Sequence, residues 1–480
     1  MCPSSTTRPR RERRGSARWR NTGATSPPVR AGLLTVPSLG AYRPKRPCVA
    51  ERGGQVSTPS IAPPGARTLA ILAIPALVIG VVSALILWLL NQISGLLADQ
   101  IWTAWPDALG LEPYTPWWTF GVLTLTGAAV GLVVWLMPGH AGPDSATTEL
   151  SAPPLPLRVL PGLALAVTIS LAGGVSLGPE NPIIAINTAV AVTAVARFAT
   201  AVPTPLVALL ASAATIGALF GTPVAAALVF TGIVAALKSG GSLWDRLFLP
   251  VAAAGAGALT MHVLGTPPMA FTVAPFGTPE AIDLATGTLV AVVSAVLGIL
   301  AVYAFPLIHR AFHALRNPVI FTTLGGAVLG VLAIIGGPLT MFKGLEQAGQ
   351  IINNPGDYSP GTLALFTVIK LVALLIAAAA GFRGGRVFPA VFIGVALGLF
   401  FHSVIPSMPI GLAIACGVLG IVLVVTRDGW IALFLGIALT GDTTLLPILC
   451  VIVLPTWLLV TGVPELRILP KEPVAVAEST

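Results

Sequence analysis

The stretch Gly173-Gly174-Val175-Ser176-Leu177-Gly178-Pro179-Glu180-Asn181-Pro182 decides how the rest of the chain is organised, because it sets one carboxylate, Glu180, between apolar runs. Ionisable groups inside a membrane are rare and usually face a cavity or a pathway. Pro179 suits the first turn of a helix, and Gly178 permits a tight backbone just before it. We therefore expect Glu180 at a helix N-terminus, where free N–H groups and the helix dipole attract anions. The alternative is a carboxylate that only caps its own helix.

The composition is that of a membrane protein. The chain has 480 residues, of which 55% are hydrophobic and 9% charged, and its mean hydropathy is +0.90. Such a chain is too apolar for a soluble enzyme and has many runs long enough to span a bilayer. With 51 Gly and 43 Pro, many inside apolar segments, we expect an all-α polytopic bundle of tilted and broken helices in close contact.

The positive charge is concentrated in the N-terminal tail. Residues 1–55 contain 12 basic and two acidic side chains, whereas the remainder of the chain carries a net charge of −2. We divide the chain into a basic tail (1–65) predicted to be disordered, a transmembrane domain (66–466) and a short C-terminal tail (467–480). A cytoplasmic tail held inside by its charge, or an upstream start codon, is favoured over nucleic-acid binding.

Metal, cofactor and catalytic motifs are not expected. Cys2, Cys48, Cys416 and Cys450 form no close pair and no metal-ligand spacing. The i, i+4 pair of His309 and His313 has no carboxylate or cysteine near it to complete a site, so a polar loop or interfacial helix is preferred over a ligand pair. No Walker loop, HExxH or GxSxG motif is present, which argues against an ATP-driven pump or a membrane hydrolase.

The apolar runs are interrupted at corresponding places in the two halves of the chain. The first predicted span, Ile71 to Leu90, is followed by Trp102 and Trp105, which we expect at a membrane interface. Later spans are short, and in each half a Gly/Pro break precedes a helix start. This pattern predicts two inverted repeats whose short helices meet inside the membrane, as in a transporter or channel.

Three breaks, taken in order, resemble the CLC family of chloride channels and proton-coupled chloride exchangers, whose signature segments have the forms GSGIP, GREGP and GGxFxP. We assign these segments to residues 139–143, 178–182 and 384–389. The resemblance covers roughly residues 66 to 466 and is strongest to a divergent bacterial branch of ion-transport proteins.

The resemblance implies roles for individual residues. It makes Glu180 the gate, an acid that occupies an anion site and swings away. Backbone N–H groups at the helix starts would coordinate the anion. The implied anion-binding residues are Gly139, His140, Pro143, Gly178, Pro179, Asn181, Pro182, Gly384, Gly385, Arg386, Val387, Phe388 and Pro389.

The sequence also departs from the family pattern. His140 stands where the family commonly has an anion-coordinating serine, Val387 replaces a phenylalanine, and Leu466 occupies the place of a coordinating tyrosine. The stretch Val229-Phe230-Thr231-Gly232-Ile233 offers no second acid for the usual proton route. Conduction gated by Glu180 therefore fits better than proton-coupled exchange, which stays as the alternative.

Two cationic side chains have open assignments. Arg386 faces the pore, or else it snorkels to the interface. Lys370, inside an apolar helix, is expected to pair with a helix end or carbonyls rather than with the ion. In sum, the resemblance implies a non-enzymatic homodimer in the bacterial plasma (inner) membrane that moves chloride-like anions, and protons if the alternative holds.

Overall fold

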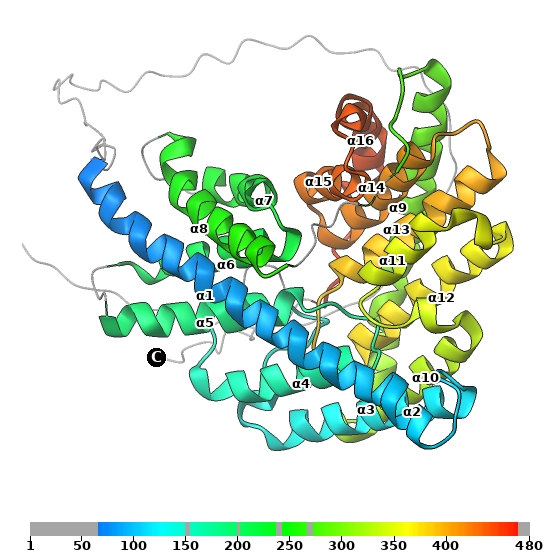
Figure 1. The fold of residues 1–480 in the computed structure, drawn as a ribbon, viewed down its shortest axis with the longest axis horizontal. Coiled ribbons are helices and arrows are strands. Elements are labelled where there is room, and N and C mark those ends of the chain that lie inside the picture. Colours follow the sequence, from blue (N-terminus) through cyan, green and yellow to red (C-terminus); the bar gives the residue numbers. More distant parts are fainter. Residues whose placement is uncertain are drawn as a thin grey trace, which may run out of the picture. The chain divides into compact units, whose positions relative to one another are not determined.

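The computed structural model describes residues 66–148, 154–198, 202–236, 242–265, 271 and 273–468. The predicted N-terminal tail and all but two residues of the predicted C-terminal tail lie outside them. Among the described residues the regular elements are all helices, and the only β pairing is an isolated bridge. The α-helices shown in Figure 1 are α1 (Ala66–Asp99), α2 (Trp105–Ala108), α3 (Pro116–Leu136), α4 (Leu160–Ala172), α5 (Glu180–Phe198), α6 (Thr204–Phe220), α7 (Pro223–Ala236), α8 (Leu243–Val263), α9 (Ala281–His313), α10 (Pro318–Gly336), α11 (Leu345–Asn353), α12 (Pro360–Ala379), α13 (Val387–Val404), α14 (Ile410–Thr426), α15 (Gly429–Thr440) and α16 (Leu446–Val460).

The helices divide into long and short ones, as the interrupted apolar runs predict. Nine helical stretches of the described residues are long and apolar enough to cross a bilayer. Five others are apolar but only 10–17 residues long. At about 1.5 Å per residue a helix of that length spans less than the roughly 30 Å hydrocarbon layer. The all-α, polytopic membrane fold is therefore confirmed, and it includes several helices too short to cross the bilayer upright.

Glycines let the central helices approach each other closely. A Cβ added at Gly127 of α3 would lie 2.3 Å from the carbonyl oxygen of Thr322 in α10, and one at Gly326 would lie 2.2 Å from that of Leu123. Gly394 of α13 meets the backbone of α14 at Val418 in the same way. Small residues at helix contacts are typical of membrane bundles, where backbone packing replaces the hydrophobic effect.

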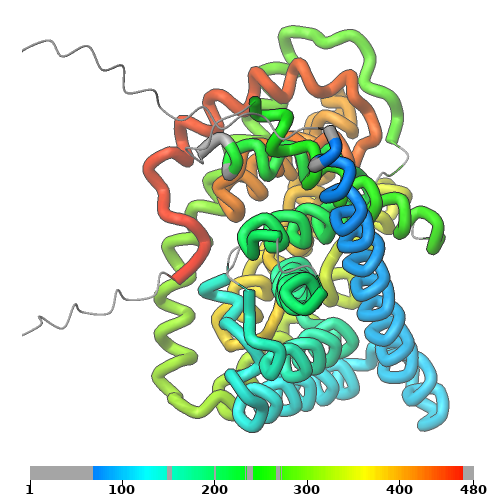
Figure 2. The backbone as a smooth tube through the Cα atoms, turned by 90° about the vertical axis from the view of Figure 1, so that its left-hand side faces the viewer, coloured from blue at the N-terminus to red at the C-terminus, as the bar shows by residue number. Residues whose placement is uncertain are grey.

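The first helix is longer than predicted. Instead of ending at Leu90, α1 runs to Asp99 and continues through a π-helical turn (Gln100–Ala104) into α2. It packs against α8, α6, α4 and α5 and follows one flank of the bundle in Figure 2. Trp102, which we expect at a membrane interface, is packed inside the protein: its side chain is 1% exposed and its Nε1–H donates to the carbonyl of Ala172 at 2.9 Å. Trp105 is 53% exposed.

Lys370 of α12 holds a buried loop in place. Its ammonium group donates to the carbonyls of Thr340, Met341 and Phe342 at 3.1, 2.8 and 2.7 Å. The N–H of Phe342 in turn donates to the carbonyl of Gly174, just before the Glu180 break. The assignment of Lys370 to carbonyl pairing is therefore confirmed.

Candidate anion-binding site

Two loops from the two halves of the chain meet at the candidate site. Gly178 precedes α5, and Gly385 precedes α13. They form the isolated antiparallel bridge, with N–H···O distances of 2.9 Å from Gly178 to Gly385 and 2.6 Å in return. The bridge therefore brings together the first turns of two helices, where backbone N–H groups have no partner within the helix.

The carboxylate of Glu180 occupies the space between these helix starts. Its side chain is 1% exposed, and its Oε1 accepts the N–H of Phe388, in the first turn of α13, at 2.7 Å. Its Oε2 is buried without a hydrogen-bond partner. A Cβ at Gly178 or Gly385 would lie 2.2 or 2.0 Å from this oxygen, so only glycine leaves room for the carboxylate. Glu180 thus reaches across to the other half of the chain and does more than cap α5.

Arg386 supplies a positive charge at the same place. It is 8% exposed, and its Nη2 donates to the carbonyl of Thr148 at 2.8 Å. Its Nη1 is buried without a partner. Among nearby carboxylates, the negative charges of Glu465 and Glu180 act most strongly on the guanidinium. The snorkelling assignment of Arg386 is wrong, because the guanidinium is enclosed by protein.

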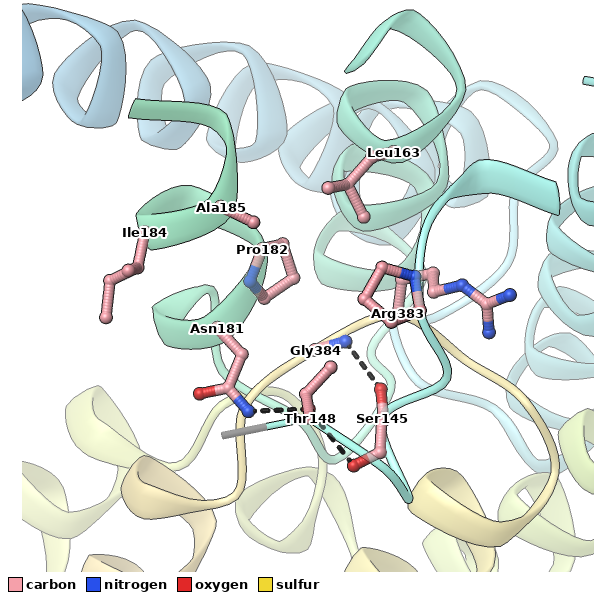
Figure 3. Close-up of a pocket in the computed structure, with 10 residues that line it drawn as sticks. Ser145, Thr148, Leu163, Asn181, Pro182, Ile184, Ala185, Arg383 and Gly384 are labelled. Carbon is pink, nitrogen blue, oxygen red and sulfur yellow. Dashed lines mark hydrogen bonds between the residues drawn. The ribbon is translucent and has the colours of Figure 1, made fainter. Parts of the chain in front are cut away.

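The residues that flank Glu180 contact two cavities. Asn181 and Pro182 line a small one of about 20 Å³, together with Ser145, Thr148 and other residues (Figure 3). A cavity of this size holds about one water molecule. Pro179 and Phe388 line a larger cavity of about 240 Å³ that also touches Lys343 and His262. The Glu180 carboxylate accepts a hydrogen bond from Phe388, which lines the larger cavity, whereas Asn181, the next residue of α5, lines the smaller one.

Gly139 and His140 of the first break lie outside both cavities, whereas Pro143 and the following Ser145 line the small one. Gly139 and His140 form a left-handed turn, and the exposed His140 ring contacts the carbonyl of Val134 at 3.1 Å. Ser145, which the sequence analysis did not single out, is buried. Its Oγ accepts the N–H of Gly384 at 2.8 Å and donates to a carbonyl of the same loop.

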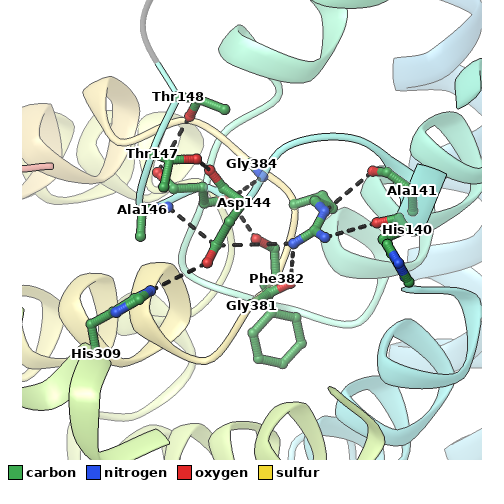
Figure 4. Close-up of polar contacts among 12 residues, drawn as sticks. His140, Ala141, Asp144, Ala146, Thr147, Thr148, His309, Gly381, Phe382 and Gly384 are labelled. Carbon is green, nitrogen blue, oxygen red and sulfur yellow. Dashed lines mark hydrogen bonds and ion pairs between the residues drawn. The ribbon is translucent and has the colours of Figure 1, made fainter. Parts of the chain in front are cut away.

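Arg383 ties the first break to the third. Its guanidinium donates to the carbonyls of His140, Ala141 and Gly381 at 2.8, 3.2 and 2.7 Å (Figure 4). Leu466, at the position of the expected tyrosine, is 2% exposed. The N–H of Ile468 donates to the carbonyl of Ala146, so the end of the described chain also reaches this loop.

The expectation that no carboxylate completes the His309 and His313 pair is wrong. Asp144 comes from a position 165 residues earlier than His309, and its Oδ2 lies 3.4 Å from Nε2 of each histidine. Burial by itself raises the pKa of Asp144. Hydrogen bonds from the two histidines and the positive charge of Arg383 lower the pKa by more than burial raises it, so it lies below its usual value. The carboxylate is therefore ionised at neutral pH.

A polytopic membrane bundle whose broken helices direct their N-termini at a buried carboxylate has the architecture of an anion-transport protein. The family model described as "Voltage gated chloride channel" matches residues 126–459. The chain belongs to the CLC family, and it is an integral, multi-pass membrane protein.

Relatives and solved structures agree with this assignment. The chain is 48% identical over 405 residues to "Putative ion-transport protein YfeO" of Escherichia coli O9:H4 (strain HS), which covers 84% of this chain and 96% of that protein. The fold of this chain matches that of a slow cyanobacterial Cl−/H+ antiporter with a TM-score of 0.69 and 19% identity, over 82% of this chain and 96% of the antiporter chain. A CLC-type fluoride/proton antiporter matches with a TM-score of 0.63 and 17% identity, over 83% and 97%.

Proposed function

We propose that chloride-like anions cross the membrane through this chain along a path that Glu180 closes, and that conduction is channel-like. The observation that carries the proposal is the hydrogen bond from the Phe388 N–H to the buried Glu180 carboxylate. The carboxylate takes the position at a helix N-terminus that suits a mobile anion. Gate and anion would therefore compete for one set of donors.

The mechanism follows from the groups around Glu180. Protonation removes the negative charge of the carboxylate and lets it turn away. The Phe388 N–H then loses its acceptor, and Arg386, two residues earlier in the chain, has an Nη1 without a partner. An anion entering from the larger cavity, which Phe388 lines, meets the freed N–H. Because backbone dipoles provide much of the attraction, the anion is held without a deep electrostatic well and can leave again.

The distribution of acids favours conduction over proton exchange. Among the described residues, Glu180 and Asp283 are the buried carboxylates. Asp283 accepts the N–H of Glu280 at the start of α9 and is thus used as a cap. Helix α7, after Pro223, contains no acid. Because Asp283 is engaged as a cap, a proton released by Glu180 lacks a second buried carboxylate that is free to receive it. The two structurally similar antiporters keep exchange as the alternative for the experiment to decide.

The test is anion efflux from liposomes that contain the purified protein, with proton uptake recorded in parallel. We expect chloride flux without uphill proton movement. We also expect Glu180→Gln, which mimics the protonated acid, to give flux that no longer depends on pH. Glu112→Gln, at an exposed carboxylate, is the matched control. Protons driven uphill by a chloride gradient would establish exchange, and unchanged flux in Glu180→Gln at every pH would remove Glu180 from the mechanism.

We further propose a homodimer with one path per chain, by analogy with the CLC family. The molecular mass of the detergent-solubilised protein, measured by light scattering with the detergent contribution subtracted, tests this assembly. A mass of one chain would contradict it.

A further inference from the structure

We propose that Asp144, His309 and His313 form a binding site for a divalent transition-metal ion of the Zn2+ type, which joins the loop after α3 to the end of α9. Loop and helix come from distant parts of the sequence, and Asp144 is in the loop that also carries Ser145 (Figure 4). The metal site itself does not depend on the proposed anion path.

The spacing of the three ligand atoms fits a tetrahedral ion. Asp144 Oδ2 lies 3.4 Å from Nε2 of His309 and 3.4 Å from Nε2 of His313, and all three ligand atoms lie within 4.8 Å of one another. Zinc bonds of about 2.0–2.1 Å at the tetrahedral angle separate neighbouring ligand atoms by about 3.4 Å. The three atoms would therefore need only small shifts to contact one ion.

The hydrogen bonding of His313 leaves a position that a metal ion would fill well. Its Nδ1 lies 3.1 Å from the carbonyl oxygen of His309, and its Nε2 faces the Asp144 carboxylate. Both neighbours only accept hydrogen bonds, so a neutral imidazole can satisfy one of them. A metal ion in place of the Nε2 proton bonds to His313 and Asp144 together. The Nδ1–H then keeps the carbonyl bond that commonly orients metal-bound histidines.

The two stacked imidazoles favour the same solution. Their ring centroids are 3.8 Å apart with an interplanar angle of 22°. Two imidazolium charges at this distance would repel each other, whereas two neutral ligands around one ion do not. Because the rings are nearly parallel, metal binding turns at least one of them so that both Nε2 lone pairs point at the ion. The side chain of His313 is 34% exposed, which leaves it room to turn and gives the ion access.

The second oxygen of Asp144 is already held. Its Oδ1 accepts the N–H of Ala146 at 3.2 Å and lies 4.0 Å from Nη1 of Arg383. Arg383 also uses its donors on three backbone carbonyls. Hydrogen-bond partners of a ligating carboxylate orient it and strengthen metal binding.

The metal site adjoins the loop that carries Gly385 of the central bridge. Ser145 follows Asp144 and accepts the N–H of Gly384, which is adjacent to Gly385 of the central bridge. A bound ion would fix this loop against α9. We therefore expect Zn2+ to change the rate of anion flux, and this one consequence rests on the proposed function.

The test uses the purified full-length protein, prepared without a polyhistidine tag. Zn2+ binding is measured by calorimetry, and Co2+ binding by the visible absorption of a tetrahedral complex. We expect one high-affinity ion per chain in the wild type. We expect at least a tenfold loss of affinity in His309→Ala, His313→Ala and Asp144→Asn. His402→Ala is the control, because its ring contacts the Met408 carbonyl elsewhere in the bundle.

Several results would overturn the proposal. They are unchanged Zn2+ affinity in His313→Ala, an equal loss in His402→Ala, or no Co2+ absorption in the wild type. The four cysteines stay in place in every variant, so their contribution cancels. If a variant fails to fold, the half-exposed His313 and the shape-preserving Asp144→Asn provide the decision. Zn2+ that binds but leaves anion flux unchanged would refute the coupling to the path, and a flux response absent only in the ligand variants would support it.

Discussion

The substitution Gly385→Ala should open the proposed gate while Glu180 itself stays unchanged in the sequence. The added Cβ would lie 2.0 Å from Oε2 and 2.6 Å from Cδ of Glu180, and the nearest contacts are all atoms of that side chain. Gly385 does not have a positive φ, so alanine fits the backbone. The carboxylate must therefore leave its position, and the Phe388 N–H loses its acceptor.

The size of the effect follows from the lost hydrogen bond. A hydrogen bond to a charged group contributes about 1.5–3 kcal/mol. Since about 1.4 kcal/mol is a factor of ten, the ratio of open to closed gates should rise about 10- to 150-fold. The assay is chloride efflux from liposomes at neutral pH, where we expect faster flux with a weaker dependence on pH.

Two comparisons decide whether the effect acts through Glu180. Gly178→Ala should act in the same direction, because its Cβ also meets only the carboxylate, whereas Gly121→Ala, with no atom within 4 Å of the new Cβ, should leave flux unchanged. In a Glu180→Ala background, Gly385→Ala should add nothing. An equal increase in that background, or wild-type flux in the folded single variant, would refute the reasoning.

Two further predictions concern the buried cations. Arg386→Ala should weaken chloride binding about tenfold, measured by calorimetry, because the partnerless buried Nη1 is lost; an unaltered affinity would mean that this donor does not meet the anion. Lys370→Met should lower the free energy of unfolding by about 3 kcal/mol or more, because three buried carbonyls lose their donor. Thermal unfolding in detergent measures this loss, and a melting temperature equal to that of the wild type would contradict it.

Local patterns were enough to predict the helices and the central carboxylate. Glu180 stands out because an acid between apolar runs follows a Gly-Pro pair, and this information is contained in a few residues. The third break is equally local. The length of α1 was not predictable in the same way, since Trp102 is polar enough for an interface and yet packs inside against Ala172 and Tyr114.

Contacts across the chain explain what the sequence could not provide. The Gly-x-x-Gly-Pro spacing drew attention to residues 139–143, but the buried hydroxyl near the site belongs to Ser145, whose partner Gly384 lies 239 residues away. The polar Asp144-Ser145 pair directly after the first break is the signal that could have indicated it. Asp144 and His309 are 165 residues apart, so no local spacing reveals that they meet.

The bridge between Gly178 and Gly385 also has a consequence for biosynthesis. Glu180 and its donor Phe388 are separated by 208 residues, so the closed gate cannot form while only the first half of the chain has left the ribosome. At about 5–20 residues per second, roughly 10–40 s pass between the synthesis of the two partners. During this time the acid stays unpaired, and a prematurely terminated chain lacks the second helix start altogether. An incomplete product therefore cannot form the contact between Glu180 and Phe388 on which the proposed gate depends.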